Sequence, residues 1–144
     1  MDELTESLLA VDPGDKRVGV AAVGPLGIVK PVATLDAHPR AAMLVRLAEL
    51  ASDRDAVGIV VGLPLNMDGT EGPAARAARA LGEDIVQATG LRVVFHDERL
   101  TSIDASQRLG ALGLTRAQRK QRLDAVAAAA ILEGYLAARA HGTA

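Results

Sequence analysis

The sequence contains no cysteine and no tryptophan, and its aromatic residues are limited to one tyrosine and one phenylalanine. Without cysteine, the chain can form no disulfide framework, thiolate zinc site or cysteine-based catalytic centre. The scarcity of aromatics removes the stacking platforms on which many single-strand binding proteins place bases. There is no secretory signal pattern and no uninterrupted run of about 18 apolar residues, so we expect a soluble, cytoplasmic protein without membrane-spanning segments.

The chain has 144 residues, of which 49% are hydrophobic, and this length predicts a single domain over residues 1–144. Its net charge of −2 conceals an asymmetry. Residues 1–72 carry 11 acidic and 6 basic side chains, whereas residues 73–144 carry 7 acidic and 10 basic ones. A biased genome composition would also explain the many Arg and Ala residues. The asymmetry is nevertheless compatible with an acidic metal site beside a surface that follows phosphates.

Alternating apolar segments and turn signals predict a mixed sheet flanked by helices, which is an α/β fold. Pro31 cannot donate to a neighbouring strand and therefore indicates an edge strand. An approximate capping box at Thr101 and a better one at Thr115 predict helix starts. The expected strands cover residues 7–12, 17–23, 28–35, 56–61 and 91–96, and the expected helices cover 40–52, 73–89, a segment from Thr101 and about 124–139.

Polar side chains follow the predicted strands at the carboxyl ends where ligands gather in α/β sheets. Asp12 ends the first strand, and Asn66 and Asp68 follow the fourth. The sequence Asp97-Glu98-Arg99 follows the fifth. Ordinary alternatives exist, since Asp12 precedes a proline in a turn and Arg99 could pair with a neighbouring acid in a solvated loop.

One further acid, Asp124, heads the apolar stripe of the last predicted helix, which continues through Ala128, Ile131 and Tyr135. It could serve as an N-terminal helix acid, or it could point a carboxylate at the end of the sheet where Asp12 emerges. Converging carboxylates require a cation. In a chain without cysteine, their oxygens favour Mg²⁺ or Mn²⁺ over zinc.

The three histidines are scattered along the chain. We expect His38 and His141 to lie at the surface. We expect His96 to be a structural or solvent-facing imidazole, although its position beside the acids would also allow it to assist a water molecule. The sequence has neither a nucleophile elbow nor a Walker A motif.

Four segments together resemble the YqgF/RuvX family of RNase H-like nucleases, which are related to Holliday-junction resolvases. The resemblance covers nearly the whole chain, and its most specific parts are the second and third segments. They are LLAVDPGDKRVGVA (8–21), VVGLPLNMDGTEG (60–72), HDERLTS (96–102) and KQRLDAVAAAAIL (120–132).

The resemblance implies an RNase H-like fold with a five-stranded mixed sheet in the order 3-2-1-4-5. It implies a metal-dependent nuclease acting on the 5′ end of pre-16S ribosomal RNA, with Asp12, Glu98 and Asp124 as the acidic triad that binds Mg²⁺ or Mn²⁺. In the related two-metal mechanism, one ion prepares the attacking water and the other stabilises the leaving oxygen. Many relatives carry their second acid at the end of the fourth strand, where this chain has Gly62-Leu63-Pro64. Glu98 therefore lies one strand farther from Asp12, at about 9.6 Å by strand spacing.

The basic stretch before Asp124 is the best candidate for phosphate contacts, unless it is simply a solvated helix face. The glycine-rich segment 62–72 would let a phosphate backbone come close, unless it is an ordinary turn. The basic residues are Arg116, Arg119, Lys120 and Arg122.

Other functions stay open at this stage. Some relatives are resolvases of branched DNA, and a non-catalytic ribosome-assembly protein would retain the same fold. A phosphotransfer enzyme of the actin or hexokinase type shares the first hairpin, but it closes two such domains over ATP and 144 residues supply only one. The sequence does not choose between RNA and DNA, between the two metals, or between a monomer and a homodimer.

Overall fold

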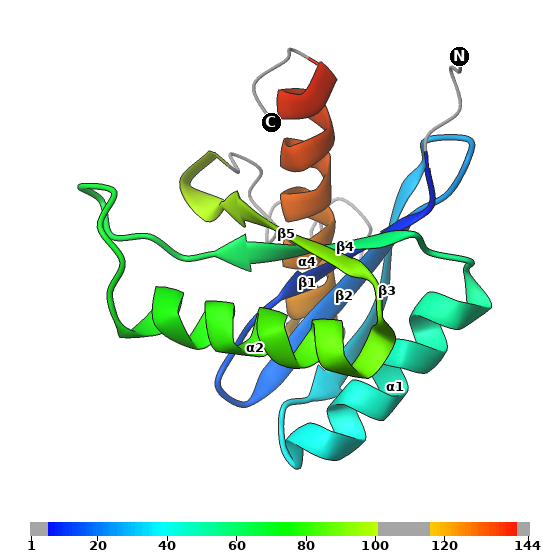
Figure 1. Cartoon of the computed structure of the whole chain (residues 1–144), viewed down its shortest axis with the longest axis horizontal. Coiled ribbons are helices and arrows are strands. Elements are labelled where there is room, and N and C mark those ends of the chain that lie inside the picture. The colour runs from blue at the N-terminus through cyan, green and yellow to red at the C-terminus, as the bar shows by residue number, and fades with distance from the viewer. Residues whose placement is uncertain (1–5, 101–115, 141–144) are drawn as a thin grey trace.

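A computed structural model describes residues 6–100 and 116–140, including the side chains of residues 6–99 and 123–140. The elements follow the predicted order closely (Figure 1). They are β1 (Leu8–Asp12), β2 (Arg17–Val23), β3 (Val29–Asp36), α1 (Arg40–Asp53), β4 (Gly58–Leu63), α2 (Pro73–Thr89), β5 (Arg92–Asp97), the 3-10 turn η1 (Glu98–Leu100) and α4 (Arg116–Ala140).

The five strands form one mixed sheet in the order β3-β2-β1-β4-β5, which confirms the expected topology. The strand β2 runs antiparallel to both of its neighbours, β1 and β3, whereas β1, β4 and β5 run parallel to one another. Pro31 lies in the edge strand β3, as predicted, where the register with β2 shifts between Val20 and Ala21. Because β1 is the central strand and Asp12 is its last residue, Asp12 lies at the middle of the carboxyl-end edge of the sheet.

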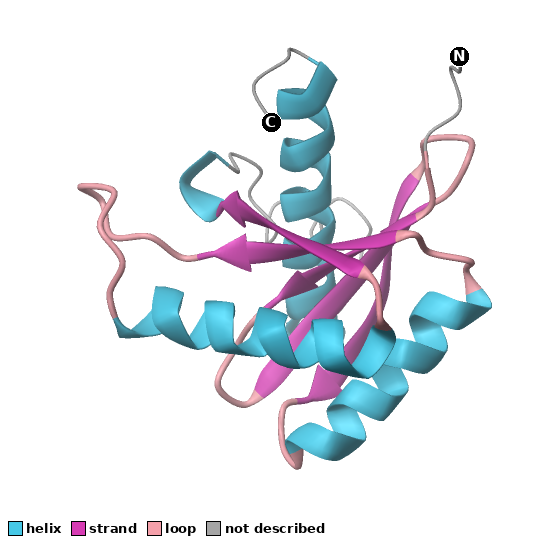
Figure 2. Ribbon diagram, viewed as in Figure 1, coloured by secondary structure: helices cyan, strands magenta, loops and turns pink. Residues whose placement is uncertain are grey.

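Helices cover both faces of the sheet (Figure 2). On one face, α1 and α2 pack against alternate strand residues such as Leu9, Val11 and Ile59. On the other face, α4 packs against the intervening residues, including Ala10 and Val60. This alternation is the period-two pattern of strands buried on both sides.

The helix boundaries agree with the sequence for α2, which begins at Pro73 and ends before Gly90 in the left-handed conformation (φ 71°). The expected range of about 124–139 for the last helix is wrong at its start, because α4 begins at Arg116, directly after Thr115, where the second capping box predicts a helix start. The Arg- and Gln-rich stretch 116–123 favours helix intrinsically and extends it N-terminally. Asp124 therefore lies in the third turn of α4 and is not an N-terminal helix acid.

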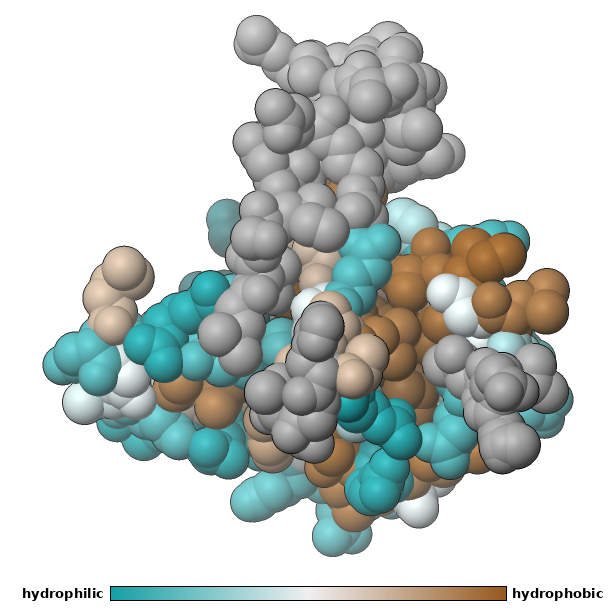
Figure 3. Space-filling view, turned by 90° about the horizontal axis from the view of Figure 1, so that it is seen from above, coloured by the Kyte–Doolittle hydropathy of each residue, from teal (hydrophilic) through white to brown (hydrophobic). Residues whose placement is uncertain are grey.

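The expected helix from Thr101 and the capping residue Thr115 lie outside the described residues. Within the described part of the chain, no helix is both long and apolar enough to cross a bilayer. Seen from above, hydrophobic side chains gather on one side of the surface (Figure 3). Large apolar side chains exposed near the β2–β3 turn include Leu26 (83% exposed) and Ile28 (58%).

Candidate active site

Asp12 projects from the α4 face of the sheet, because it alternates with Val11, which packs toward α1 and α2. Its direct partner on β2 is Gly19. On the other side, β4 pairs with β1 up to Val61, so Gly62 is the next residue beside Asp12. Asp12 is thus flanked on both sides by residues that have no side chain.

The glycine at position 19 allows α4 to approach the sheet at backbone distance. A Cβ atom at Gly19 would lie 1.8 Å from the carbonyl oxygen of Asp124 and 2.9 Å from the backbone nitrogen of Ala125. Any side chain at position 19 would push the helix outward. Gly19 therefore determines that Asp124 lies close to Asp12.

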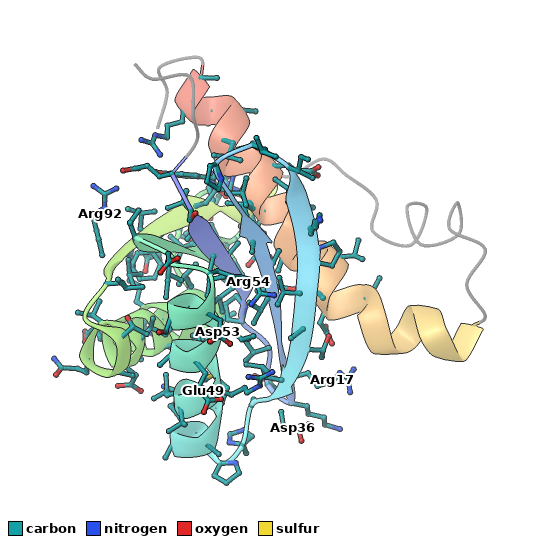
Figure 4. The ribbon with its side chains drawn as sticks, turned by 90° about the vertical axis from the view of Figure 1, so that its right-hand side faces the viewer. Arg17, Asp36, Glu49, Asp53, Arg54 and Arg92 are labelled. Carbon is teal, nitrogen blue, oxygen red and sulfur yellow. The ribbon has the colours of Figure 1, made fainter. Side chains whose placement is uncertain are left out.

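Arg17 holds the side chain of Asp124, since the guanidinium Nε donates to Oδ2 at 2.9 Å. Arg17 opens β2 on the same face as Gly19 and pairs in register with Asp36 on β3. Both lie at the lower end of the sheet in Figure 4. The ion pair between Arg17 and Asp124 places one positive charge at an otherwise acidic edge of the sheet.

Gly62 has the corresponding role for Glu98. A Cβ atom at Gly62 would lie 3.1 Å from both Cγ and Cδ of Glu98 and 2.7 Å from Cδ1 of Ile131. The Glu98 side chain thus lies over β4 from the turn η1 and reaches toward β1. The distance of one additional strand that separates Glu98 from Asp12 is partly bridged by this side chain.

The three acids interact electrostatically. Burial raises the pKa of Asp12 to about 7, and the negative charges of Glu98 and Asp124 contribute to the shift. Burial also raises the pKa of Glu98, with a further contribution from Asp97. A carboxyl group that holds its proton near neutral pH marks a place where a cation would be stabilised.

Arg99 connects the acidic edge to the loop after β4. Its guanidinium contacts both carboxylate oxygens of Asp97, with the shortest distance 2.7 Å, and Nη1 donates to the carbonyl oxygen of Met67 at 3.0 Å. The guanidinium holds the pKa of Asp97 below its usual range. The expected pairing of Arg99 with a neighbouring acid is confirmed, and it leaves Glu98 as the acid of this segment that is free of Arg99.

Comparison with known proteins agrees with this architecture. The family model RuvX, described as Holliday junction resolvase, matches residues 6–138. The chain belongs to the RuvX family.

Curated relatives of this RuvX-family chain carry the name "Putative pre-16S rRNA nuclease". The protein of Anaeromyxobacter dehalogenans (strain 2CP-1) is 44% identical over 133 residues, which cover 92% of this chain and 97% of the relative. That of Chloroflexus aurantiacus (strain J-10-fl) is 40% identical over 92% of this chain and 87% of the relative. The expected family and the expected nuclease class are therefore confirmed.

Solved structures of this fold include RuvC of Thermus thermophilus in complex with a Holliday junction substrate. It aligns with a TM-score of 0.61 and 18% identity over 96% of this chain and 98% of that one. The fowlpox virus Holliday junction resolvase aligns with a TM-score of 0.53 and 12% identity over 92% and 99%. These similarities confirm the RNase H-like fold.

The donor set of the RuvX-family chain suits a hard divalent cation, because Asp12, Glu98 and Asp124 offer only carboxylate oxygens. Among residues 6–99 and 123–140, no group of three or more His, Asp or Glu side chains meets the geometry of a preformed metal site. The raised pKa of Asp12 provides the independent sign that positive charge is lacking there. The acids are brought to one edge, and they would have to close around a cation.

Asn66 and Asp68 do not join the acids. The Asp68 carboxylate accepts hydrogen bonds from the backbone nitrogen of Thr70 at 3.0 Å and its hydroxyl at 2.6 Å. The Asn66 amide donates to the same hydroxyl at 2.9 Å. Both side chains therefore shape the loop, and its glycine at position 69 adopts a positive φ of 88°.

His96 is a buried imidazole, 4% exposed, and is not solvent-facing. It pairs with Gly62 in the sheet and meets Tyr135 of α4 edge-to-face, with ring centroids 6.2 Å apart. Its Nε2 has no hydrogen-bond partner among the described residues, and burial lowers its pKa. The expected structural role is thus supported. His38 is exposed, as predicted, while His141 lies outside the described residues.

Sequence reasoning missed three residues that build this site: Gly19, Gly62 and Arg17. Glycine inside a strand pattern is a signal for close backbone approach, and this signal was available at position 19. Gly62 lay one residue beyond the predicted end of the fourth strand, so the signal was missing there. Nothing in the sequence indicates which acid Arg17 contacts. The basic residues Arg116, Arg119, Lys120 and Arg122 belong to the first two turns of α4, and their side chains lie outside the described set.

Proposed function

We propose that this chain is a cytoplasmic, metal-dependent endonuclease that hydrolyses phosphodiester bonds during maturation of the 5′ end of pre-16S rRNA. The observation that carries the proposal is the half-buried Asp12, whose pKa is raised to about 7 beside Glu98 and Asp124 at the carboxyl end of β1. Asp12, Glu98 and Asp124 are the catalytic residues and the ligands of Mg²⁺ or Mn²⁺. The names of the curated relatives support the substrate.

The bound cation supplies the activation of water and the charge stabilisation that phosphodiester hydrolysis needs. The residues of the chain prepare this chemistry. Burial and the charges of Glu98 and Asp124 raise the pKa of Asp12 to about 7, so its two oxygens would serve as metal ligands once its proton is lost to solvent. Glu98 approaches from over Gly62, and Asp124 is presented by the close contact of α4 with Gly19.

Arg17 contributes a charge for the substrate. Only its Nε contacts Asp124, so the guanidinium retains further donors that can bind a phosphate oxygen next to the acids. The exposed fraction of the Arg17 side chain is 46%, which leaves it accessible to a nucleic acid. Arg17 can thus contact Asp124 and a phosphate oxygen of the substrate at the same time.

A resolvase acting on branched DNA is the second candidate. The description of the family model favours it, and the RuvC neighbour of the same fold is in complex with a Holliday junction substrate. The acidic site would serve either substrate, because it acts on the phosphodiester and does not read bases. The choice therefore depends on surfaces outside the acids.

The decisive experiment incubates the purified protein with an RNA carrying the 5′ end of pre-16S rRNA and with a four-way DNA junction, each with Mg²⁺ or Mn²⁺. We expect RNA cleavage that Asp12→Asn and Asp124→Asn abolish while the protein stays folded by circular dichroism. Arg46→Gln, an exposed arginine on α1 far from the edge, is the matched control. Cleavage that survives both Asn variants would refute the site, and cleavage of the junction alone would establish the second candidate.

The basic stretch 116–122 provides the expected phosphate contacts. Replacing Arg116, Arg119, Lys120 and Arg122 with Gln should weaken RNA binding and flatten its salt dependence, because each lost phosphate contact reduces the number of released counterions. Fluorescence anisotropy at several salt concentrations measures this slope. An unchanged slope would exclude the stretch from the interface.

A further inference from the structure

A small pocket opens at the same end of the sheet as Asp12, but on the face covered by α1 and α2. It is lined by residues of the turn between β1 and β2, of the start of α1 and of the first half of α2. Its volume is about 160 Å³. This is well below the roughly 300 Å³ at which pockets for drug-sized ligands begin, and it suits a single planar ring system.

The walls and the rim of this pocket differ in chemistry. Its walls include the apolar side chains of Val18, Met43 and Leu81, all of which are buried. Its rim carries Asp15, His38 and Arg40. An apolar slot with a few polar groups at its mouth binds flat, partly polar ligands.

The rim is already held in place. The His38 ring donates from Nε2 to the carbonyl oxygen of Asp15 at 3.0 Å, which leaves Nδ1 of the neutral ring as an acceptor. The Arg40 guanidinium pairs with Asp84 of α2. Both groups are flat, and imidazole and guanidinium planes are surfaces on which unstacked bases lie.

The charges of the rim disfavour a phosphate as the occupant. Arg40 is neutralised by Asp84, and the Asp15 carboxylate would repel an anion. A neutral ring with hydrogen-bonding edges meets neither obstacle. The pocket therefore fits a nucleobase better than it fits the backbone of the nucleic acid.

The position of the pocket relates it to the acids. Pro13 and Pro64 line it, and they directly follow Asp12 and Leu63 at the carboxyl ends of β1 and β4. A strand whose phosphate lies at Asp12 on one face can therefore continue around this edge and insert a neighbouring base on the other face.

We propose that this pocket binds one unpaired nucleobase of a single-stranded RNA segment next to the cleaved bond. The inference rests on the proposed nuclease function and specifies its substrate class. A base that enters the pocket cannot be paired or stacked in a helix, so the pocket selects single-stranded RNA over a fully paired junction arm.

The test is an abasic scan. A short single-stranded RNA spanning the cleaved bond is prepared with one abasic nucleotide at each position in turn. Affinity is measured by fluorescence anisotropy with Asp12→Asn protein and Mg²⁺, which prevents cleavage. We expect one position at which loss of the base weakens binding about fivefold or more.

Two pairs of variants connect this position to the pocket. Ala77→Leu fills it from an exposed position on α2, and Ala80→Leu adds the same bulk on α2 outside it. Only Ala77→Leu should weaken binding of the intact RNA. The affinity of this variant should no longer change when the base at the sensitive position is removed. Arg40→Gln removes a rim group, whereas Asp84→Asn breaks the same ion pair but keeps that group. We therefore expect Arg40→Gln to weaken binding more.

The outcomes separate the two proposals. A flat abasic scan, or an Ala77→Leu protein that behaves like Ala80→Leu, overturns the pocket even if the wild-type protein cleaves RNA. A scan with the expected position supports the pocket even if no cleavage is observed. The absence of cleavage with either metal and either substrate overturns only the proposed nuclease.

Discussion

The two faces of the sheet are packed with side chains of different size. On the face of α1 and α2, large aliphatic side chains such as Leu9, Leu47 and Ile59 fill the interior and are almost fully buried. On the face of α4, the contact next to the acids consists of small residues, among them Ala21 and Ala128. Large side chains keep a helix layer farther from the sheet, whereas small side chains let the helix pack close to it.

The face under α1 and α2 therefore mainly determines stability, whereas the face under α4 mainly determines the geometry of the candidate site. Burial of aliphatic area under α1 and α2 stabilises the domain in proportion to the area removed from water. The close contact under α4 contributes less area but determines where Asp124 lies relative to Asp12. Mutations on the two faces should therefore produce different phenotypes.

The largest combined effect on stability and cleavage is expected for Gly19→Ala. Its new Cβ atom would lie 1.8 Å from the carbonyl oxygen of Asp124, so α4 must move. We expect a loss of about 3 kcal/mol in the free energy of unfolding and the loss of cleavage by the protein that remains folded. The control is Gly58→Ala, whose Cβ would meet the flexible Leu8 side chain at 3.3 Å. Wild-type cleavage by Gly19→Ala would refute the role given to this contact.

The opposite face is tested by Leu47→Ala. Leu47 is fully buried on α1, so its truncation leaves a cavity and should cost about 2–5 kcal/mol in the free energy of unfolding. Cleavage per folded molecule should stay unchanged below the melting temperature. Denaturant unfolding and initial cleavage rates measure the two quantities. Val45→Ala, exposed on the same helix, should change neither.

A smaller effect concerns the pH dependence contributed by Asp12. Because the folded state raises its pKa from 3.8 to about 7, the fold binds an additional proton in that interval. Without metal, stability should therefore fall as the pH rises from about 4 through 7. Asp12→Asn removes this contribution and should melt at a higher temperature above pH 7, by roughly 2–4 °C per kcal/mol.

With divalent metal, the wild-type protein should instead melt at a higher temperature than Asp12→Asn above pH 7. The metal would stabilise the wild-type protein more, because Asp12→Asn lacks one of the proposed carboxylate ligands. Melting curves at pH 5 and pH 8, with EDTA and with Mg²⁺, distinguish the two effects. Equal melting temperatures of both proteins at pH 8 in EDTA would contradict the raised pKa.

The smallest effect is expected for Arg99→Gln. Arg99 is exposed, so the loss of its contacts to Asp97 and Met67 should cost less than about 1 kcal/mol in stability. Cleavage should fall several-fold, because the turn that carries Glu98 is no longer tied to the loop after β4. Arg79→Gln, which breaks the comparable exposed pair with Glu71, is the control for stability. Equal cleavage by the two variants would show that Arg99 does not position Glu98.

The five strands followed from sequence pattern, because alternating burial and turn residues are local signals, although β4 ends at Leu63, two residues after its predicted end. The order of the strands in the sheet, and the triad Asp12, Glu98 and Asp124, were predicted from the family resemblance. The expected range 124–139 began too late because helix propensity continues beyond the apolar stripe, whereas the capping box at Thr115 predicted the start that α4 shows. The approach of Glu98 over Gly62 could not be derived, since strand spacing ignores the direction of a side chain after the strand ends.

The contact between α4 and Gly19 also bears on how the protein folds during synthesis. The candidate site joins a residue of the first strand to a residue of α4, so a nascent chain lacks Asp124 until α4 has been synthesised. Domains fold from the N-terminus during synthesis, and the sheet can form before the helix docks. The proposed cleavage activity would then appear only after α4 has docked on Gly19.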